Sequence, residues 1–232
     1  MNIIPRGIIV SAQAKAGNPF KNSERLSYMA EAAELGGAVA IRADGVDDIT
    51  AMRKRVSIPI IGINKKADET GRIVITPDFE SAKAIADVGA SVIALDATFY
   101  ESNIRADVKE TIKAIKEKLG LPVMADISTL EEAIRASEYG ADLVSTTLNG
   151  YIPGELHSDD ALYTPNLELL KSIIDSPYVK CPVIGEGRFW RIEDVREAFA
   201  MGAHGLVIGK AITNPMAATA YYVNAGFGKV NQ

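Results

Sequence analysis

The sequence predicts a (β/α)8 TIM barrel of the phosphate-binding type that forms a single domain over residues 1–232. Two phrases that alternate along the chain support this fold. The first occurs as LGGAVAIRA, VGASVIALDA, YGADLVSTT and MGAHGLVIG, starting at residues 35, 88, 139 and 201. The second occurs as IPRGIIVSAQ, IPIIGINK, LPVMADIS and CPVIGEGR, starting at residues 4, 58, 121 and 181. Each copy contains a short apolar run, and segments with helical periodicity separate the runs, as in consecutive βα units.

The number of these units favours a closed sheet. Right-handed crossovers allow either an open doubly wound sheet or a closed barrel, and eight nearly equal units favour closure. Runs that are apolar from end to end suit strands covered on both faces. Ser128 with Glu131 predicts a capping box, and Thr76-Pro77 and Thr164-Pro165 predict two more helix starts. Helices are expected to end at Gly36, Gly89, Gly140 and Gly202.

Composition limits the class of partner. The chain has 47% hydrophobic and 24% charged residues and a net charge of −5, so nucleic acid and anionic membranes are not expected partners. Cys181 is the only cysteine, which excludes an internal disulfide and a cysteine-rich zinc site. No apolar run has the length of a membrane span, and the start MNIIPRGIIV lacks the pattern of a secretion signal. We therefore expect a cytoplasmic protein.

Polar residues follow nearly every predicted strand. In a TIM barrel the functional site lies where the strands end and the βα loops begin. These positions are, in chain order, Gln13, Arg42, Lys65, Asp96, Asp126, Thr146 with Thr147, Glu186, and Gly209 with Lys210. A single charge at a strand end is usually a solvated cap or half of a structural ion pair, but the whole set predicts one polar mouth. Lys66, one residue further into its loop, is expected to point to solvent.

The ends of the last two predicted strands carry glycines suited to phosphate binding. Gly185, Gly187 and Gly209 flank these ends, where TIM barrels often hold a phosphate on backbone amides near a short helix. The segment GKAITNP could supply that helix, Lys210 would add positive charge, and Arg188 follows Gly187. The alternative is that the glycines only form tight turns.

No metal or other cofactor is predicted. His204 lies in a helix-to-strand turn and His157 stands alone in a long loop, so neither has the partners of a zinc ligand. A divalent ion on the carboxylates at the strand ends stays an alternative, although the lysine and arginine in the same mouth would compete for them. The loop 149–165 has the length of a lid or ligand-contacting segment.

Nine motifs spread over nearly the whole chain resemble one family, the bacterial N-acetylmannosamine-6-phosphate 2-epimerases of amino-sugar and sialic acid catabolism. They are IVSAQA, GGAVAIRADGVDDI, PIIGINK, ITPDFE, VIALDAT, MADISTLEEA, VSTTLNGY, PVIGEGR and GLVIGKAIT. MADISTLEE together with STTLNGY is the most specific combination. The resemblance implies a barrel whose catalytic lysine is Lys65, with Glu186 as its acidic partner. It implies substrate-orienting roles for Arg42, Asp126 and Gln13.

Two further residues belong to the predicted site. Thr146, at the end of the sixth predicted strand, is placed with the substrate-binding residues. Lys210 departs from the glycine or other small residue expected after Gly209, so the phosphate loop is expected to differ in detail.

The implied reaction inverts carbon 2 of N-acetylmannosamine 6-phosphate and gives N-acetylglucosamine 6-phosphate. The proton at carbon 2 is acidic only beside the carbonyl group of the open-chain aldehyde, so the site needs a base and a stabiliser for the enolate. Burial beside Arg42 would lower the pKa of Lys65, whereas an ionised Glu186 would raise it. Lys65 would take the proton, and either Glu186 or the protonated Lys65 would return one on the other face.

Two other functions stay open. Lys65 could act instead as the Schiff-base nucleophile of a class I aldolase or lyase, or the barrel could bind a sugar phosphate without catalysis. In each case the expected partner is a small-molecule sugar phosphate. Two copies of the chain could also associate through the outer helices as a homodimer.

Overall fold

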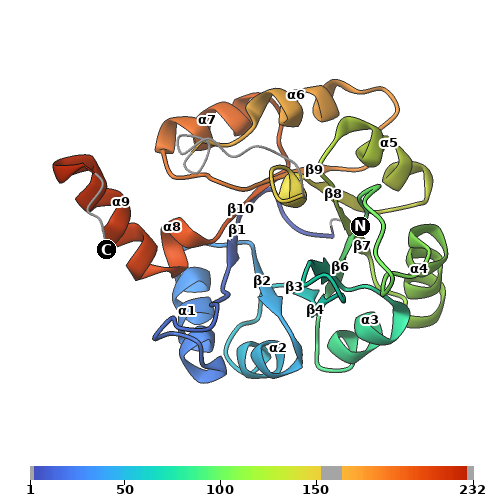
Figure 1. Cartoon of the computed structure of the whole chain (residues 1–232), viewed down its shortest axis with the longest axis horizontal. Coiled ribbons are helices and arrows are strands. Elements are labelled where there is room, and N and C mark those ends of the chain that lie inside the picture. Colours follow the sequence, from blue (N-terminus) through green and yellow to red (C-terminus); the bar gives the residue numbers. More distant parts are fainter. Residues whose placement is uncertain (1–2, 153–163, 229–232) are drawn as a thin grey trace.

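The computed structural model describes residues 3–152 and 164–228 and has a closed barrel of eight parallel strands at its centre (Figure 1). The strands follow one another around the barrel in chain order, and the last pairs with the first. They are β1 Gly7–Ser11, β2 Ala40–Asp44, β3 Ile60–Ile63, β6 Val92–Asp96, β7 Val123–Asp126, β8 Leu143–Ser145, β9 Val183–Glu186 and β10 Gly205–Ile208. The predicted TIM barrel is therefore confirmed.

Helical segments connect the strands, and most of them cover the outside of the barrel (Figure 1). They are α1 Ser23–Leu35, α2 Val46–Arg53, α3 Phe79–Ala86, α4 Val108–Ala114 with the π-helical turn η1 Ile115–Leu119, α5 Leu130–Glu138, the 3-10 turn η2 Thr146–Leu148, α6 Leu167–Asp175, α7 Ile192–Ala200, α8 Lys210–Thr213 and α9 Pro215–Phe227. Helix α8 is the short helix predicted in GKAITNP. Helix α9 extends away from the barrel beyond α8, and none of its residues is buried.

Side chains of each strand alternate between two apolar layers. Along β3, Ile60 packs in the cluster that includes helix residues such as Leu26, whereas Ile61 packs in the second cluster, which consists mainly of strand residues. Along β7, Ala125 and Met124 divide in the same way. Because successive strand residues point to opposite faces, both faces need apolar side chains, which explains why the strand sequences do not alternate with polar residues.

The start of helix α5 differs from the prediction by one residue. Its capping box consists of Thr129 and Glu132, whose side chains accept each other's backbone N–H groups, and not of Ser128 and Glu131. Both pairs have the spacing of a capping box. The fold selects the second pair because Glu132 is buried, where its carboxylate also accepts the N–H of Phe99 at 2.5 Å.

Helices α3 and α6 begin two residues after the predicted Thr-Pro steps. Asp78 and Asn166 are their N-caps, and each side chain accepts the backbone N–H three residues further on. Thr76 cannot cap α3, because it has a φ of 47° and bonds to the end of β3. Helix α1 ends at the predicted Gly36, which is its C-cap and is followed by Gly37 with a positive φ. After α3, α5 and α7 the positive φ angles occur at the predicted Gly89, Gly140 and Gly202.

An antiparallel hairpin that the repeats did not predict follows β3. It consists of β4 Lys65–Ala67 and β5 Ile73–Ile75. Asp68 closes its turn, because the carboxylate accepts two backbone N–H groups of the turn, and Gly71 has a φ of 83°. The sequence Asp-Glu-Thr-Gly carries this turn signal. The hairpin matters for function because its first residue is Lys65.

Several expectations concern other parts of the chain. His157 and most of the predicted lid loop 149–165 lie outside the described residues. A ring nitrogen of His204 lies 2.8 Å from the carbonyl oxygen of Ile4, at the amino-terminal end of the barrel. Within residues 3–152 and 164–228, every helix is too short or too polar to cross a membrane.

Candidate active site

Arg42, Asp126 and Glu186 meet at the carboxyl ends of their strands. Arg42 on β2 donates two hydrogen bonds to Asp126 on β7, from Nη1 to Oδ1 at 3.0 Å and from Nη2 to Oδ2 at 2.6 Å. Its Nη1 also lies 3.3 Å from Oε2 of Glu186 at the end of β9. The side chains of Arg42, Asp126 and Glu186 are 1%, 0% and 16% exposed. One buried cation thus connects two carboxyl groups across the barrel.

Burial and mutual charge set the protonation of this cluster. Burial lowers the pKa of Arg42, but the charges of Asp126 and Glu186 outweigh it and raise this pKa above its ordinary value. Burial raises the pKa of Glu186, and the charge of Asp126 adds to the rise, against the opposing effects of Arg42 and a hydrogen bond from Thr147. A carboxyl group with a raised pKa keeps its proton closer to neutral pH and can donate it to a bound molecule.

Lys65 lies at the edge of the same mouth, with 34% of its side chain exposed. Its Nζ donates a hydrogen bond to Oε1 of Gln13 at 2.5 Å and lies 3.8 Å from Oδ2 of Asp44. Oδ1 of Asp44 also accepts the backbone N–H of Lys65 at 3.1 Å. Gln13 is fixed in turn, because its Nε2 donates to Oγ of Ser11 at 2.8 Å. Asp44 and Gln13 therefore orient the amine.

The environment of Lys65 favours its neutral form. Burial lowers the pKa of its amine and the charge of Arg42 acts in the same direction, against the charges of Asp44 and Glu186, and the pKa is lowered overall. A lowered pKa increases the fraction of neutral amine that a base or nucleophile needs. Lys65 follows β3 and Glu186 ends β9, so both lie at the carboxyl end of the barrel, where the charge of each acts on the pKa of the other. Lys66, by contrast, is half exposed, and its Nζ lies 3.9 Å from the carboxylate that caps α3.

Two consecutive threonines of η2 contact Glu186. Oγ1 of Thr146 accepts the N–H of Glu186 at 2.9 Å and donates to its carbonyl oxygen at 3.0 Å. Oγ1 of Thr147 lies 2.7 Å from Oδ1 of Asp126 and 2.9 Å from Oε2 of Glu186. Thr146, which was predicted to bind substrate, is buried and holds the backbone of β9, whereas Thr147 contacts the carboxyl groups.

The residues predicted to bind phosphate lie after β9 and β10. Gly187 and Arg188 have φ angles of 108° and 63°, so the chain turns sharply after Glu186. The Arg188 guanidinium group does not stand free: Nε donates to the carbonyl oxygen of Thr164 at 3.0 Å, and Nη2 donates to Oδ1 of Asn149 at 3.2 Å.

Gly209 and Lys210 form the junction between β10 and α8. Gly209 is the N-cap of α8, and a Cβ atom at this position would lie 3.3 Å from Cβ of Ser11. A side chain larger than glycine would therefore crowd β1. Lys210 is exposed at the first position of the helix.

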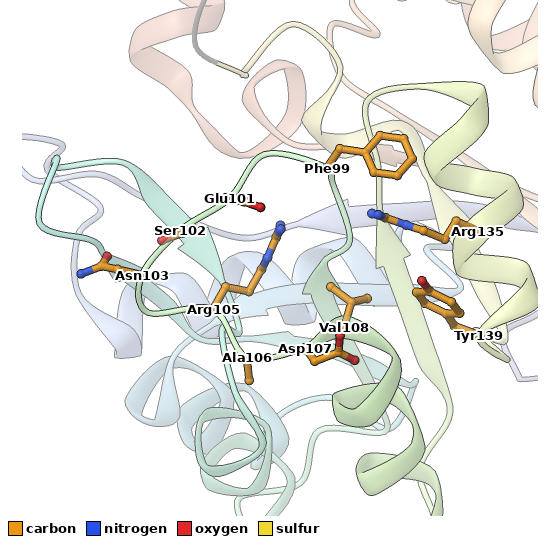
Figure 2. A pocket seen from close by; sticks show the side chains of 10 residues that line it. All are labelled: Phe99, Glu101, Ser102, Asn103, Arg105, Ala106, Asp107, Val108, Arg135 and Tyr139. Atoms are coloured by element: carbon orange, nitrogen blue, oxygen red, sulfur yellow. The ribbon is translucent and has the colours of Figure 1, made fainter.

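Asp96 lies at the same end of the barrel, in register with Asp126 on the neighbouring strand, but it pairs with other arginines than Arg42. Its carboxylate is bound by Arg72 at 2.6 Å and by Arg105 at 2.8 Å. Arg105 also lines an open cavity of about 580 Å³ shown in Figure 2, together with Arg135. None of the predicted site residues lines this cavity. Arg135 donates to the backbone carbonyl groups of Ala97 and Thr98, and Arg105 pairs with Asp96.

Similarity to known proteins identifies the family. Residues 26–226 match the family model NanE, described as "Putative N-acetylmannosamine-6-phosphate epimerase". The chain belongs to this family. A "Putative N-acetylmannosamine-6-phosphate 2-epimerase" of Caldanaerobacter subterraneus is 43% identical over 96% of this chain and 93% of its own length. A relative of the same description from Cutibacterium acnes is 40% identical over 94% and 93% of the two chains.

Solved structures agree with this assignment. The N-acetylmannosamine-6-phosphate 2-epimerase of Clostridium perfringens superposes with a TM-score of 0.88 at 38% identity, covering 97% of this chain and 95% of that one. A thiamine phosphate pyrophosphorylase of Pyrococcus furiosus, at 18% identity and a TM-score of 0.59 over 91% and 89% of the two chains, shares the fold alone. As a member of the N-acetylmannosamine-6-phosphate epimerase family, the chain is an isomerase of amino-sugar metabolism with a sugar phosphate as its class of substrate.

The candidate site includes residues that the sequence analysis did not select. Asp44 follows Arg42 by two positions, and Ser11 precedes Gln13 by two. Because strand side chains repeat their direction every two residues, this spacing is the signal that places them at the same mouth. Within the described residues, no three His, Cys, Asp or Glu side chains are arranged to hold a metal ion.

Proposed function

We propose that this member of the epimerase family interconverts N-acetylmannosamine 6-phosphate and N-acetylglucosamine 6-phosphate by proton transfer at carbon 2, with Lys65 as the base. The observation that carries the proposal is the placement of two groups at one barrel mouth: the amine of Lys65, held by Gln13 and Asp44, and the carboxyl group of Glu186, beside Arg42 and Thr147. The surroundings lower the pKa of the amine and raise that of the carboxyl group. Groups whose environments move their pKa values towards neutrality suit acid and base roles at carbon. The names of the relatives given above contain the same sugar phosphate.

The proposed reaction begins with the open-chain aldehyde. The neutral amine of Lys65 takes the proton at carbon 2, and the electron pair of the broken C–H bond moves towards the carbonyl oxygen to form an enolate. Arg42, which is always cationic, stabilises the oxygen or the neighbouring hydroxyl groups. One such donor in a site without water is worth about 3 to 4 kcal/mol. Glu186, or the protonated Lys65, then delivers a proton to the other face of carbon 2.

The contacts refine the proposed binding roles. Both carboxylate oxygens of Asp126 accept hydrogen bonds from Arg42, so we assign Asp126 to orienting the guanidinium group. Gln13 holds the amine of Lys65 and would reach the acetamido group beside it. Thr146 acts through the backbone of Glu186. Gly187, Arg188, Gly209 and Lys210 are the proposed phosphate-binding set.

Deuterium exchange tests the base. The proton spectrum of N-acetylmannosamine 6-phosphate is followed in heavy water with the wild type, Lys65→Ala and the control Lys66→Ala. We expect exchange at carbon 2 with the wild type and the control, and no exchange with Lys65→Ala, whose fold is checked by circular dichroism. Exchange at the wild-type rate in Lys65→Ala would assign the base to another residue.

The same lysine could act as a Schiff-base nucleophile, and the two routes give different products with borohydride. A stable mass increase on Lys65 in the presence of substrate would support the aldolase or lyase route, and its absence supports proton transfer. Tight binding of the sugar phosphate without any exchange in the wild type would indicate a barrel that binds without catalysis.

We also propose that two copies of the chain associate, in the cytoplasm, through helix α9. Residues 215–227 carry no charged side chain, and Met216, Tyr222 and Phe227 are 55%, 73% and 86% exposed. An apolar helix that extends from the barrel without a buried residue is typical of an interface. A second copy of the same chain would cover this surface symmetrically.

A further inference from the structure

The hydroxyl group of Thr147 lies among three oxygen atoms. Its Oγ1 is 2.7 Å from Oδ1 of Asp126, 2.9 Å from Oε2 of Glu186 and 2.9 Å from Oγ of Ser145. A hydroxyl group has one proton to donate and two lone pairs to accept with. It can therefore donate to only one of these three oxygens at a time, and the others need protons of their own.

The partners of each oxygen limit where the protons can be. Asp126 receives two hydrogen bonds from Arg42, which is the geometry of an ionised carboxylate, and so it can only accept. If Thr147 donates to Asp126, then Oε2 of Glu186 can bond to Thr147 only by carrying a proton itself. If Glu186 is ionised, the Thr147 proton has to turn towards Glu186. Asp126 then keeps both hydrogen bonds from Arg42.

We propose that Thr147 is a positioning residue that holds Oε2 of Glu186 in place in both of its protonation states, by turning one hydroxyl proton between Asp126 and Glu186. The proposal deepens the proposed function, because it rests on Glu186 exchanging a proton with substrate. When Glu186 gives its proton to carbon 2, the Thr147 O–H turns from Asp126 to the new carboxylate. When Glu186 regains a proton, the O–H turns back, and no proton is gained or lost at Thr147.

The local fold supports this role. Thr147 is the second residue of η2, and the preceding Thr146 ties the turn to the backbone of Glu186 through two hydrogen bonds. The two threonines thus divide the task. Thr146 fixes the main chain at position 186, and Thr147 fixes the side chain. A β-branched residue with few χ1 rotamers keeps the hydroxyl oxygen in one position while its proton turns.

The predicted consequence is a change in acidity with a known sign. Thr147→Val keeps the shape of the side chain but removes the hydroxyl group, so the ionised form of Glu186 loses a donor. Its pKa should rise further, by about one pH unit. Thr147→Ser keeps the hydroxyl group and should behave like the wild type in this respect.

Two measurements test the proposal. The first is a carbon-13 NMR titration of protein labelled at the glutamate carboxyl carbons, with the Glu186 signal assigned by its absence in Glu186→Gln. The second is the pH profile of epimerisation, in which the Glu186 limb should move in the same direction and kcat should fall on the order of tenfold, with KM changing less. Thr146→Val is the control, because among residues 3–152 and 164–228 the hydroxyl group of Thr146 bonds to the backbone of Glu186 and not to its carboxyl group; this variant should not move the titration.

The outcomes separate this inference from the proposed function. A Glu186 titration that is the same in Thr147→Val and wild type overturns the role of Thr147, even if the wild type is fully active. An equal shift in Thr146→Val and Thr147→Val also overturns it, because general loosening of η2 would then suffice. A wild type without carbon-2 exchange overturns the proposed function, while the titration still reports on the hydrogen bond.

Discussion

Replacing Asp126 with asparagine tests how strongly buried charge holds the candidate site together. The substitution keeps the shape of the side chain and removes its charge, which leaves the guanidinium group of Arg42 buried at 1% exposure without its main counter-ion. Removing one partner of a buried ion pair usually costs about 3 to 5 kcal/mol. Glu186, 3.3 Å from Nη1, can compensate in part. We therefore expect a loss of about 3 kcal/mol in the free energy of unfolding.

Urea unfolding followed by circular dichroism measures this loss. The midpoint should fall at an unchanged m value, because the surface exposed on unfolding stays the same. For a chain of this size, the expected loss corresponds to a melting temperature lower by about 6 to 12 °C. Asp87→Asn is the matched control, because Asp87 pairs with Lys83 on the surface and is 57% exposed. This variant should unfold like the wild type.

The comparison has a clear negative result. If Asp126→Asn is no less stable than Asp87→Asn, then Arg42 does not depend on Asp126 for compensation of its charge. The description of the site as one buried cation between two carboxyl groups would then be wrong. The same variant should also lower the pKa of Glu186, because the charge of Asp126 contributes to raising it.

Three further predictions concern pH, packing and assembly. The pKa of Glu186 is raised in the folded chain above its unfolded value of about 4.3. Between these two pKa values the folded state binds more protons than the unfolded state, so the free energy of unfolding falls as pH rises. Glu186→Gln should flatten this dependence in urea unfolding at several pH values, and an unchanged slope would contradict the prediction. Gly62→Ala should lower the free energy of unfolding by about 1 to 3 kcal/mol through overpacking, because the new Cβ would lie 2.7 Å from Cβ of Ala90. An unchanged free energy of unfolding would show that the surrounding side chains move to make room. Light scattering should give twice the monomer mass for the wild type and the monomer mass for Tyr222→Glu in α9, and a monomeric wild type would refute the interface.

The sequence by itself was sufficient for the barrel and for the composition of its mouth. The alternating phrases place eight apolar runs at regular intervals, and a parallel sheet covered on both faces accepts few other arrangements. Arg42, Lys65, Asp126 and Glu186 could be selected because strand ends lie at one end of a TIM barrel. This inference needs only the order of the elements along the chain.

Only the tertiary structure decided which groups touch. Asp96 has the same position in the pattern as Asp126, yet two arginines from neighbouring loops bind it, and Asp126 binds Arg42 instead. The sequence pattern also failed to predict three other features. They are the hairpin that carries Lys65, the capping box of α5 shifted by one residue, and the contact of Thr147 with both carboxyl groups. The physical reason is that periodicity specifies the direction of a side chain, whereas hydrogen bonds and ion pairs depend on distances of a few tenths of an ångström between segments far apart in the chain.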